Sequence, residues 1–73
     1  MIEVRLFATL REGREKIIFV EPETAPDGAA VLASLEIPRE EVAIYLINGL
    51  HSKLDQALKD GDILAIFPPV GGG

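Results

Sequence analysis

The sequence predicts a single α+β domain in which one main helix packs on one face of a mixed sheet. The chain has 73 residues, and two separate cores in a chain of this length would each bury too little apolar surface to offset the entropy of ordering it. Apolar residues make up 48% of the chain, which is enough material for one small core. Strand patterns surround a single helical pattern, in the order strand, strand, helix, strand, short strand, strand.

The first two strands are expected to form a hairpin. Residues 2–6 alternate apolar and polar side chains with a period of two, which is typical of a strand with one buried face. Residues 16–20 are rich in β-branched and aromatic side chains, and Gly13 can supply the turn between the two runs. Pro22 ends the second strand, because proline lacks the N–H that a sheet ladder requires.

The helix is expected to start after Thr24 or Asp27, since either side chain can cap it. Pro26 suits the first turn, and Pro38 ends the helix. One further turn is expected at residues 38–41. The apolar stripe that faces the sheet consists of Gly28, Val31, Leu32 and Leu35.

The remaining strands are strongly apolar. Residues 43–47 are apolar throughout, and Asn48-Gly49 favours a tight turn with positive φ angles. Residues 50–58 are expected to form a short strand and an irregular connection, and a turn then leads to a final strand at 63–67. If the final strand pairs in parallel with the first strand, it lies centrally, where inner strands are covered more completely. The arrangement is then of the β-grasp type.

The composition excludes several classes of function. The net charge is −5 and the seven Lys and Arg residues are scattered, whereas nucleic-acid binding draws on clustered cations. There is no cysteine, so the chain has no disulfide, no thiolate metal site and no thiol nucleophile. No apolar run reaches membrane-spanning length and no signal segment precedes the first strand. We therefore expect a cytoplasmic protein that binds neither nucleic acid nor membrane.

No catalytic or metal-binding residues are expected in the chain. His51 is the only histidine, and with Asp55 alone nearby it is interpreted as a surface turn residue. The glycines precede no helix whose N-terminal amides could hold a phosphate. Two carboxylate pairs are interpreted as helix-end and turn residues: Glu40 with Glu41, and Asp60 with Asp62.

The end of the chain differs abruptly in character from the rest. We expect a β-grasp domain over residues 1–67 and an extended glycine tail over residues 68–73. Pro68 and Pro69 favour an extended polyproline conformation that leads away from the sheet. The six tail residues reach roughly 20 Å at about 3.3 Å per residue, which is enough for the chain end to enter a partner's active site. Glycines that simply fray at a chain end are the alternative.

Three segments of the chain together resemble one known protein family. The strongest similarity lies at the C-terminal end, in Asp60-Gly61-Asp62 and Phe67-Pro68-Pro69-Val70-Gly71-Gly72-Gly73. This run closely resembles the C-terminal signature of the small subunit of molybdopterin synthase, within the wider MoaD/ThiS sulfur-carrier family. Residues 7–12 resemble that family's first strand and turn, and residues 47–49 resemble its central reversal.

This resemblance implies a ubiquitin-like fold whose final glycine, Gly73, is adenylated by an E1-like adenylyltransferase and converted to a thiocarboxylate. The sulfur would then be donated in molybdopterin synthesis, for a molybdenum or tungsten cofactor, on the large subunit of molybdopterin synthase. The activating partner uses ATP, and the chain itself binds no cofactor. The residues expected to thread into the partner's active site are Pro68, Pro69, Val70, Gly71 and Gly72.

Other functions remain open at this point. The same chemistry can serve thiamin thiazole or another sulfur-containing product, or it can attach Gly73 to lysines as a protein modifier. A plain β-grasp interaction domain is a further alternative, and for such a domain the last two glycines would be dispensable.

The outer face of the sheet is predicted to hold a docking patch. Six strand residues are expected to line the helix-covered face: Val4, Leu6, Tyr45, Ile47, Leu64 and Ile66. Alternation then places Phe7, Leu46, Ile63 and Phe67 on the opposite face. A sheet with one packed face does not need these side chains, so we expect them to form an apolar partner site beside the root of the tail. A loop folded over them is the alternative. Arg11 is expected to pair with an acidic partner residue, unless it is simply a solvated surface arginine.

Overall fold

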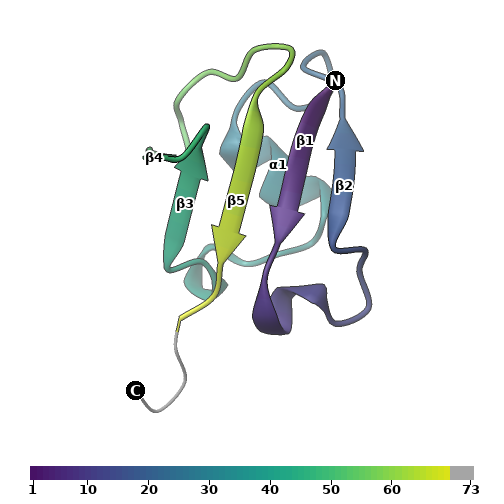
Figure 1. Cartoon of the computed structure of the whole chain (residues 1–73), viewed down its shortest axis with the longest axis vertical. Helices are drawn as coiled ribbons and strands as arrows, with labels where there is room; N and C mark the ends of the chain where they lie inside the picture. The colour runs from purple at the N-terminus through teal and green to yellow at the C-terminus, as the bar shows by residue number, and fades with distance from the viewer. Residues whose placement is uncertain (70–73) are drawn as a thin grey trace.

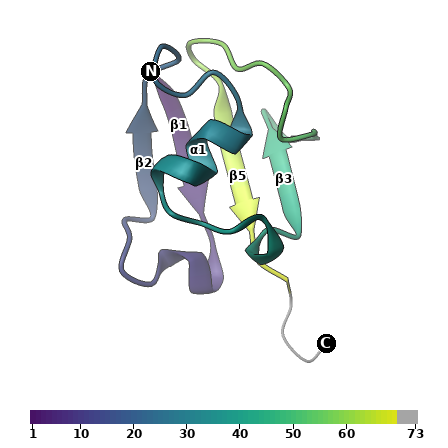
Figure 2. The ribbon, with the colours of Figure 1, turned by 180° about the vertical axis from the view of Figure 1, so that it is seen from behind.

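The computed structural model describes residues 1–69, which form a five-stranded mixed sheet with one α-helix on one face (Figure 1, Figure 2). The strand order is β2-β1-β5-β3-β4. The predicted arrangement of a mixed sheet with a single main helix is therefore confirmed. In chain order, the elements are β1 (Ile2–Leu6), the 3₁₀ turn η1 (Ala8–Arg11), β2 (Ile17–Val20), α1 (Gly28–Ser34), the 3₁₀ turn η2 (Arg39–Glu41), β3 (Ile44–Ile47), β4 (Leu50–His51) and β5 (Ile63–Phe67).

The last strand, β5, lies in the middle of the sheet. It runs parallel to β1, with Val4 opposite Leu64, and antiparallel to β3, with Tyr45 opposite Ile66. β1 and β2 form an antiparallel hairpin in which Val4 lies opposite Ile18. Both the first hairpin and the central position of the final strand are as the sequence predicts.

One core lies between α1 and the sheet. Val31 and Leu32 of the helix are buried and belong to the same apolar cluster as the inward-facing strand residues. Alternation along the strands correctly identifies those residues. Val4, Leu6, Tyr45, Leu64 and Ile66 are buried, and Ile47 is partly buried and packed against them.

The helix begins at the second of the two predicted caps. The Asp27 side chain accepts a hydrogen bond of 2.9 Å from the backbone N–H of Ala30, so it satisfies one of the free amides of the first turn. Thr24 bonds instead to the carbonyl of Glu21. Pro26 precedes the cap and does not lie in the first helical turn.

The prediction that Pro38 ends the helix is wrong, because α1 ends at Ser34. Glu36 adopts a positive φ of 57°, and the N–H of Ile37 donates to the carbonyl of Leu32 at 2.9 Å. This is the Schellman pattern, which closes a helix with a left-handed residue, here without the usual glycine.

The connections are partly as predicted. Asn48 and Gly49 have φ angles of 52° and 84°, which confirms the tight turn between β3 and β4, and Gly13 also has a positive φ of 72°. The turn η1 was not predicted. Leu10, which is 1% exposed, is the only buried residue of this turn. The sequence could not indicate the turn, because a single apolar residue forms no periodic pattern.

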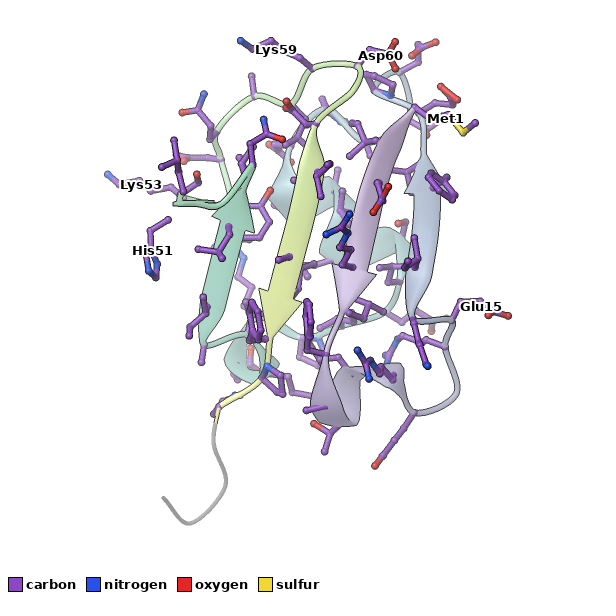
Figure 3. All side chains as sticks on the ribbon, in the orientation of Figure 1. Met1, Glu15, His51, Lys53, Lys59 and Asp60 are labelled. Atoms are coloured by element: carbon purple, nitrogen blue, oxygen red, sulfur yellow. The ribbon has the colours of Figure 1, made fainter. Side chains whose placement is uncertain are left out.

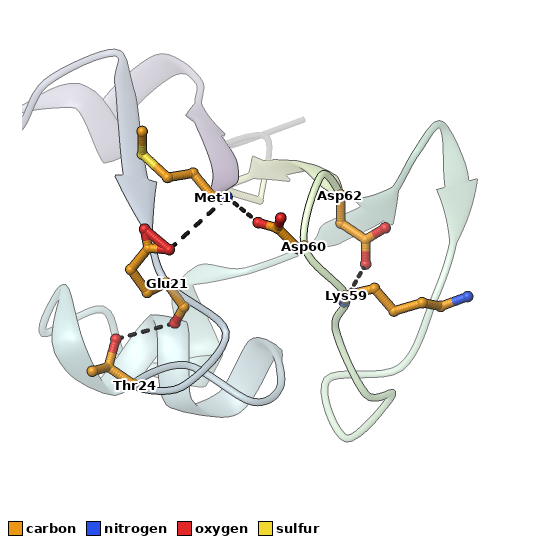
Figure 4. A network of polar contacts seen from close by, with 6 residues as sticks. All are labelled: Met1, Glu21, Thr24, Lys59, Asp60 and Asp62. Atoms are coloured by element: carbon orange, nitrogen blue, oxygen red, sulfur yellow. Dashed lines mark hydrogen bonds and ion pairs between the residues drawn. The ribbon is translucent and has the colours of Figure 1, made fainter.

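A polar network around Asp62 connects the β3–β4 turn to the start of β5, and Figure 4 shows the hydrogen bond between Lys59 and Asp62 in this network. The Asp62 carboxylate accepts hydrogen bonds from the Lys59 backbone N–H at 2.8 Å and from the Asn48 side chain at 2.9 Å. The Asn48 side-chain oxygen in turn accepts from the Ile63 N–H at 2.9 Å. The bond from Lys59, with help from Asn48, lowers the pKa of Asp62 below its usual value.

We expect Asp62→Ala to lower the free energy of unfolding by about 2 kcal/mol near neutral pH, because it leaves two donors without their acceptor. The pKa of Asp62 is lower in the folded than in the unfolded chain. Its stabilising effect is therefore present above the usual Asp pKa of about 4 and disappears as the pH falls through the folded-state value. Urea unfolding at about pH 7 and about pH 3 measures both effects. Asp55→Ala, at an exposed carboxylate, is the control, and a loss of stability that stays the same at both pH values would contradict the prediction.

Candidate functional site

The chain leaves the sheet at the end of β5. β5 ends at Phe67, as the two following prolines predict, and the backbone N–H of Ala43 donates to the Phe67 carbonyl at 2.8 Å. Pro68 is half-buried and Pro69 is exposed. In Figure 1 this exit lies at the opposite end of the sheet from the N-terminus. The predicted tail residues Val70, Gly71, Gly72 and Gly73 lie outside the described residues.

Three residues predicted for partner docking come together beside this exit. The rings of Phe7 and Phe67 stack with their centroids 4.2 Å apart and their planes 11° from parallel. The guanidinium carbon of Arg11 lies 5.3 Å from the centroid of the Phe7 ring, and Arg11 Nε donates to the Leu6 carbonyl at 2.8 Å. These contacts hold the end of β1 against the end of β5. Arg11 is thus engaged within the chain, and its pairing with a partner stays a prediction.

The other two predicted docking residues lie on the same outer face. Leu46 is opposite Ala65 in the β3–β5 register, and Ile63 precedes Ala65 by two positions, so all three point away from the helix. The helix covers the other face of the sheet, as Figure 2 shows, and Ile63 is 36% exposed. The sequence analysis attributed the apolar character of β5 to the more complete covering of inner strands. On the outer face this explanation is wrong, because Ile63 is exposed.

The apolar surface of the outer face is larger than the sequence predicts, and it runs from the exit at Phe67 back along β5 to Ile63, the first residue of that strand. Ile44 lies opposite Phe67 and is 39% exposed. It was missed, although the same alternation that identified Leu46 places it on the outer face. We refer to this surface as the tail-side patch, and it consists of Phe7, Ile44, Leu46, Ile63, Ala65 and Phe67.

A second exposed apolar pair lies on the same face but on the far strand. Ile17 and Phe19 of β2 are 47% and 56% exposed. In the register of the hairpin they lie opposite Arg5 and Glu3, whose side chains form an ion pair. The Glu3–Arg5 ion pair on β1 therefore lies between the two apolar side chains of β2 and the strand β5. The sequence analysis also missed these two residues. Residues 17–20 are all apolar, and only the period of two along a strand, which places Ile17 and Phe19 on one face, was available to indicate them.

The described residues contain no group of three or more His, Cys, Asp and Glu side chains that could hold a metal ion. His51 is exposed, as predicted, but it lies in β4 and not in a turn. Burial, together with the charges of Asp27 and Asp62, raises the pKa of Tyr45 to about 12, so its hydroxyl is neutral at physiological pH. In residues 1–69, no helix is long and apolar enough to cross a membrane.

Comparisons with known proteins agree with this geometry. Residues 4–73 match the ThiS family. Among solved structures, SAMP1 from Haloferax volcanii is 27% identical with a TM-score of 0.74, and the alignment covers 99% of this chain and 98% of that chain. The HVO 2177 protein from the same organism is 35% identical, with a TM-score of 0.73 and coverages of 99% and 85%.

A third similar structure is a complex of subunits 1 and 2 of molybdopterin-converting factor from Helicobacter pylori 26695. The matching chain is 29% identical with a TM-score of 0.66, and the coverages are 99% and 97%. The predicted β-grasp fold is confirmed by these similarities. No curated protein matches the sequence significantly.

Proposed function

This chain belongs to the ThiS family, and from that premise we propose that it is a ubiquitin-like sulfur carrier whose final glycine, Gly73, receives the sulfur. The observation that carries the proposal is the exit of the chain from the sheet beside the tail-side patch. An enzyme that holds this patch would find the tail leaving from its border, already separated from the ladder by Pro68 and Pro69.

The chemistry acts on the carboxylate of Gly73. A carboxylate is a poor electrophile, so an E1-like adenylyltransferase first joins it to the α-phosphate of ATP and releases pyrophosphate. A sulfur nucleophile then displaces AMP, and sulfur replaces one carboxylate oxygen. The partner binds the ATP, and this chain supplies the reacting group and the narrow segment that enters the active site, Pro68, Pro69, Val70, Gly71 and Gly72.

We further propose that the sulfur is used in molybdopterin synthesis, for a molybdenum or tungsten cofactor, with the large subunit of molybdopterin synthase as the second partner. The similarity to a chain of the Helicobacter pylori molybdopterin-converting factor, solved as a complex of its subunits 1 and 2, supports this assignment. Thiamin thiazole or another product is the alternative destination of the sulfur.

A second candidate function is protein modification through Gly73. The similarity to SAMP1, described as small archaeal modifier protein 1 from H. volcanii, favours it. In that case the activated glycine would be attacked by a lysine amine instead of a sulfur nucleophile. Isopeptide-linked adducts in cells that express the chain would support this function over the first.

The test of the carrier function is the intact mass of the protein after incubation with its activating enzyme, ATP and a sulfur source. A mass increase equal to the exchange of one oxygen for one sulfur is expected. An unchanged mass, under conditions that load a known carrier, would overturn the proposal. Adding the large subunit and the cofactor precursor to the loaded protein then tests the pathway, because the mass should return to its starting value.

We expect Phe7→Ala to raise the KM of the activating enzyme for this chain roughly tenfold, because it removes an apolar contact and the ring that positions Phe67. Phe19→Ala is the matched control, since it removes the same ring from the same face at an exposed position beyond the Glu3–Arg5 pair. Its KM should stay within about twofold of the wild type. Equal increases in the two variants would show that docking is not centred on the tail-side patch.

A further inference from the structure

A hollow of about 530 Å³ lies at the β3–β4 edge of the sheet. β4 has two residues and pairs only with Leu46 and Ile47. The chain then turns away after the N–H of Ser52 donates to the Tyr45 carbonyl at 3.1 Å, so the first half of β3 has no full strand beside it. We call this hollow the edge pocket. Its lining includes Arg39, Val42, Tyr45, His51, Lys53 and Asp55.

The edge pocket is a cationic site on an acidic protein. The positive charges of Arg39 and Lys53 line it, against the single carboxylate of Asp55. His51 and Lys53 project away from the sheet beside β4, as Figure 3 shows. Since the chain as a whole carries a net charge of −5, an approaching anion would be attracted here and repelled over much of the remaining surface.

The cations of the edge pocket are not used to hold the fold together. Within residues 1–69, the exposed side chains of Arg39 and Lys53 form no ion pair or hydrogen bond. The other arginines are all engaged in internal contacts: Arg5 with Glu3, Arg11 with the Leu6 carbonyl, and Arg14 with the carbonyls of Leu35 and Glu36 at the end of α1.

The edge pocket also borders the root of the tail. Ala43 contributes to its lining, and the N–H of Ala43 donates to the Phe67 carbonyl at the last residue of β5. An enzyme that receives the tail must therefore approach the chain next to this pocket. Tyr45 and Val42 also belong to the lining, and Val42 is only half-buried, so it gives the pocket an apolar surface beside its charges.

We propose that the edge pocket receives an acidic segment of the activating enzyme, with at least one Asp or Glu carboxylate placed against Arg39 and Lys53. This inference rests on the proposed sulfur-carrier function. The guanidinium group of Arg39 can bind a carboxylate through two parallel hydrogen bonds, and the lysine adds a point charge. An apolar residue next to the carboxylate would contact Val42. The pocket thereby supplies a charged contact at the edge of the sheet, separate from the apolar contact at the tail-side patch.

The test compares two double variants with the same change in net charge. Arg39→Glu with Lys53→Glu reverses the pocket, whereas Lys16→Glu with Lys59→Glu reverses two exposed lysines elsewhere. Lys16 adjoins β2 at the opposite edge of the sheet, and Lys59 lies at the opposite end from the tail (Figure 3). The measurement is ATP-dependent pyrophosphate release by the activating enzyme as a function of carrier concentration. Thermal unfolding followed by circular dichroism verifies that both variants are folded.

The pocket variant should raise KM roughly tenfold with kcat unchanged, and the control variant should stay within about twofold of the wild type. The neutral variant Arg39→Gln with Lys53→Gln should give an intermediate KM. A wild-type KM in the pocket variant, or equal increases in both double variants, would overturn the inference while leaving the carrier function in place. A wild-type chain that supports no pyrophosphate release would overturn the carrier function and the inference together.

Discussion

Deleting Gly72 and Gly73 is expected to abolish both adenylation and thiocarboxylate formation while leaving the stability of the domain unchanged. The deletion moves the terminal carboxylate back by about 7 Å, at about 3.3 Å per residue. Reacting atoms must approach within about 3.5 Å in the correct orientation, so a displacement of this size prevents the reaction. No core residue is removed, and the melting temperature should therefore match that of the full chain.

Pyrophosphate release and intact mass measure the effect of this deletion. A variant with one alanine added after Gly73 keeps all the glycines but moves the carboxylate, and we expect it to be equally inactive. If either variant reacted at the wild-type rate, the reaction would not require a carboxylate at the position of Gly73. A deletion variant that kept its cellular function would instead favour a plain interaction domain.

Gly28→Ala is expected to destabilise the fold by about 2 kcal/mol, although alanine is normally the better helix residue. A Cβ atom at position 28 would lie 2.4 Å from the hydroxyl oxygen and 2.6 Å from the Cζ atom of Tyr45. The Tyr45 side chain is 6% exposed and belongs to the core, so its ring has little room to move. In a domain of this size the melting temperature should fall by roughly 10 °C, as measured by thermal unfolding.

The control for this prediction is a double-mutant cycle with Tyr45→Phe. The Tyr45 hydroxyl is buried and has no hydrogen-bond partner among the described residues, so its removal should be neutral or slightly stabilising. The Phe variant also lacks the closest atom to the new methyl group, and it should recover part of the loss caused by Gly28→Ala. Additive effects, or a Gly28→Ala variant more stable than the wild type, would contradict the close packing.

Features that depend on local pattern could be predicted from the sequence. Strand alternation identifies the buried strand residues, and Asn48-Gly49 marks a turn whatever surrounds it. The end of α1 could not be found in this way. A left-handed Glu36 is unusual, and it is held by Arg14, whose guanidinium bonds to the carbonyls of Leu35 and Glu36 from the connection before β2. That contact between distant residues leaves no signal in the local sequence.

The candidate site could be predicted only in part. The docking residues Phe7 and Phe67 lie at the ends of two strands, and the predicted parallel pairing of β1 with β5 brings them together. Arg39 and Lys53 are scattered cations in the sequence, and they line one pocket only because β4 is too short to cover β3. Ile44 could have been predicted, because the alternation that places Leu46 on the outer face also places Ile44 there.

The central place of β5 ties the timing of folding to the last part of the chain. β1 and β3 do not pair with each other, and β5 is the strand that joins them. Until β5 has been synthesised, the earlier strands can form only two separate hairpins, β1–β2 and β3–β4. Isolated hairpins are only marginally stable in water. The decisive contacts are non-local, so folding must wait until β5 has been synthesised. Chains cut short before β5 would stay unfolded and open to proteolysis, and they would not compete with intact chains for the proposed activating enzyme.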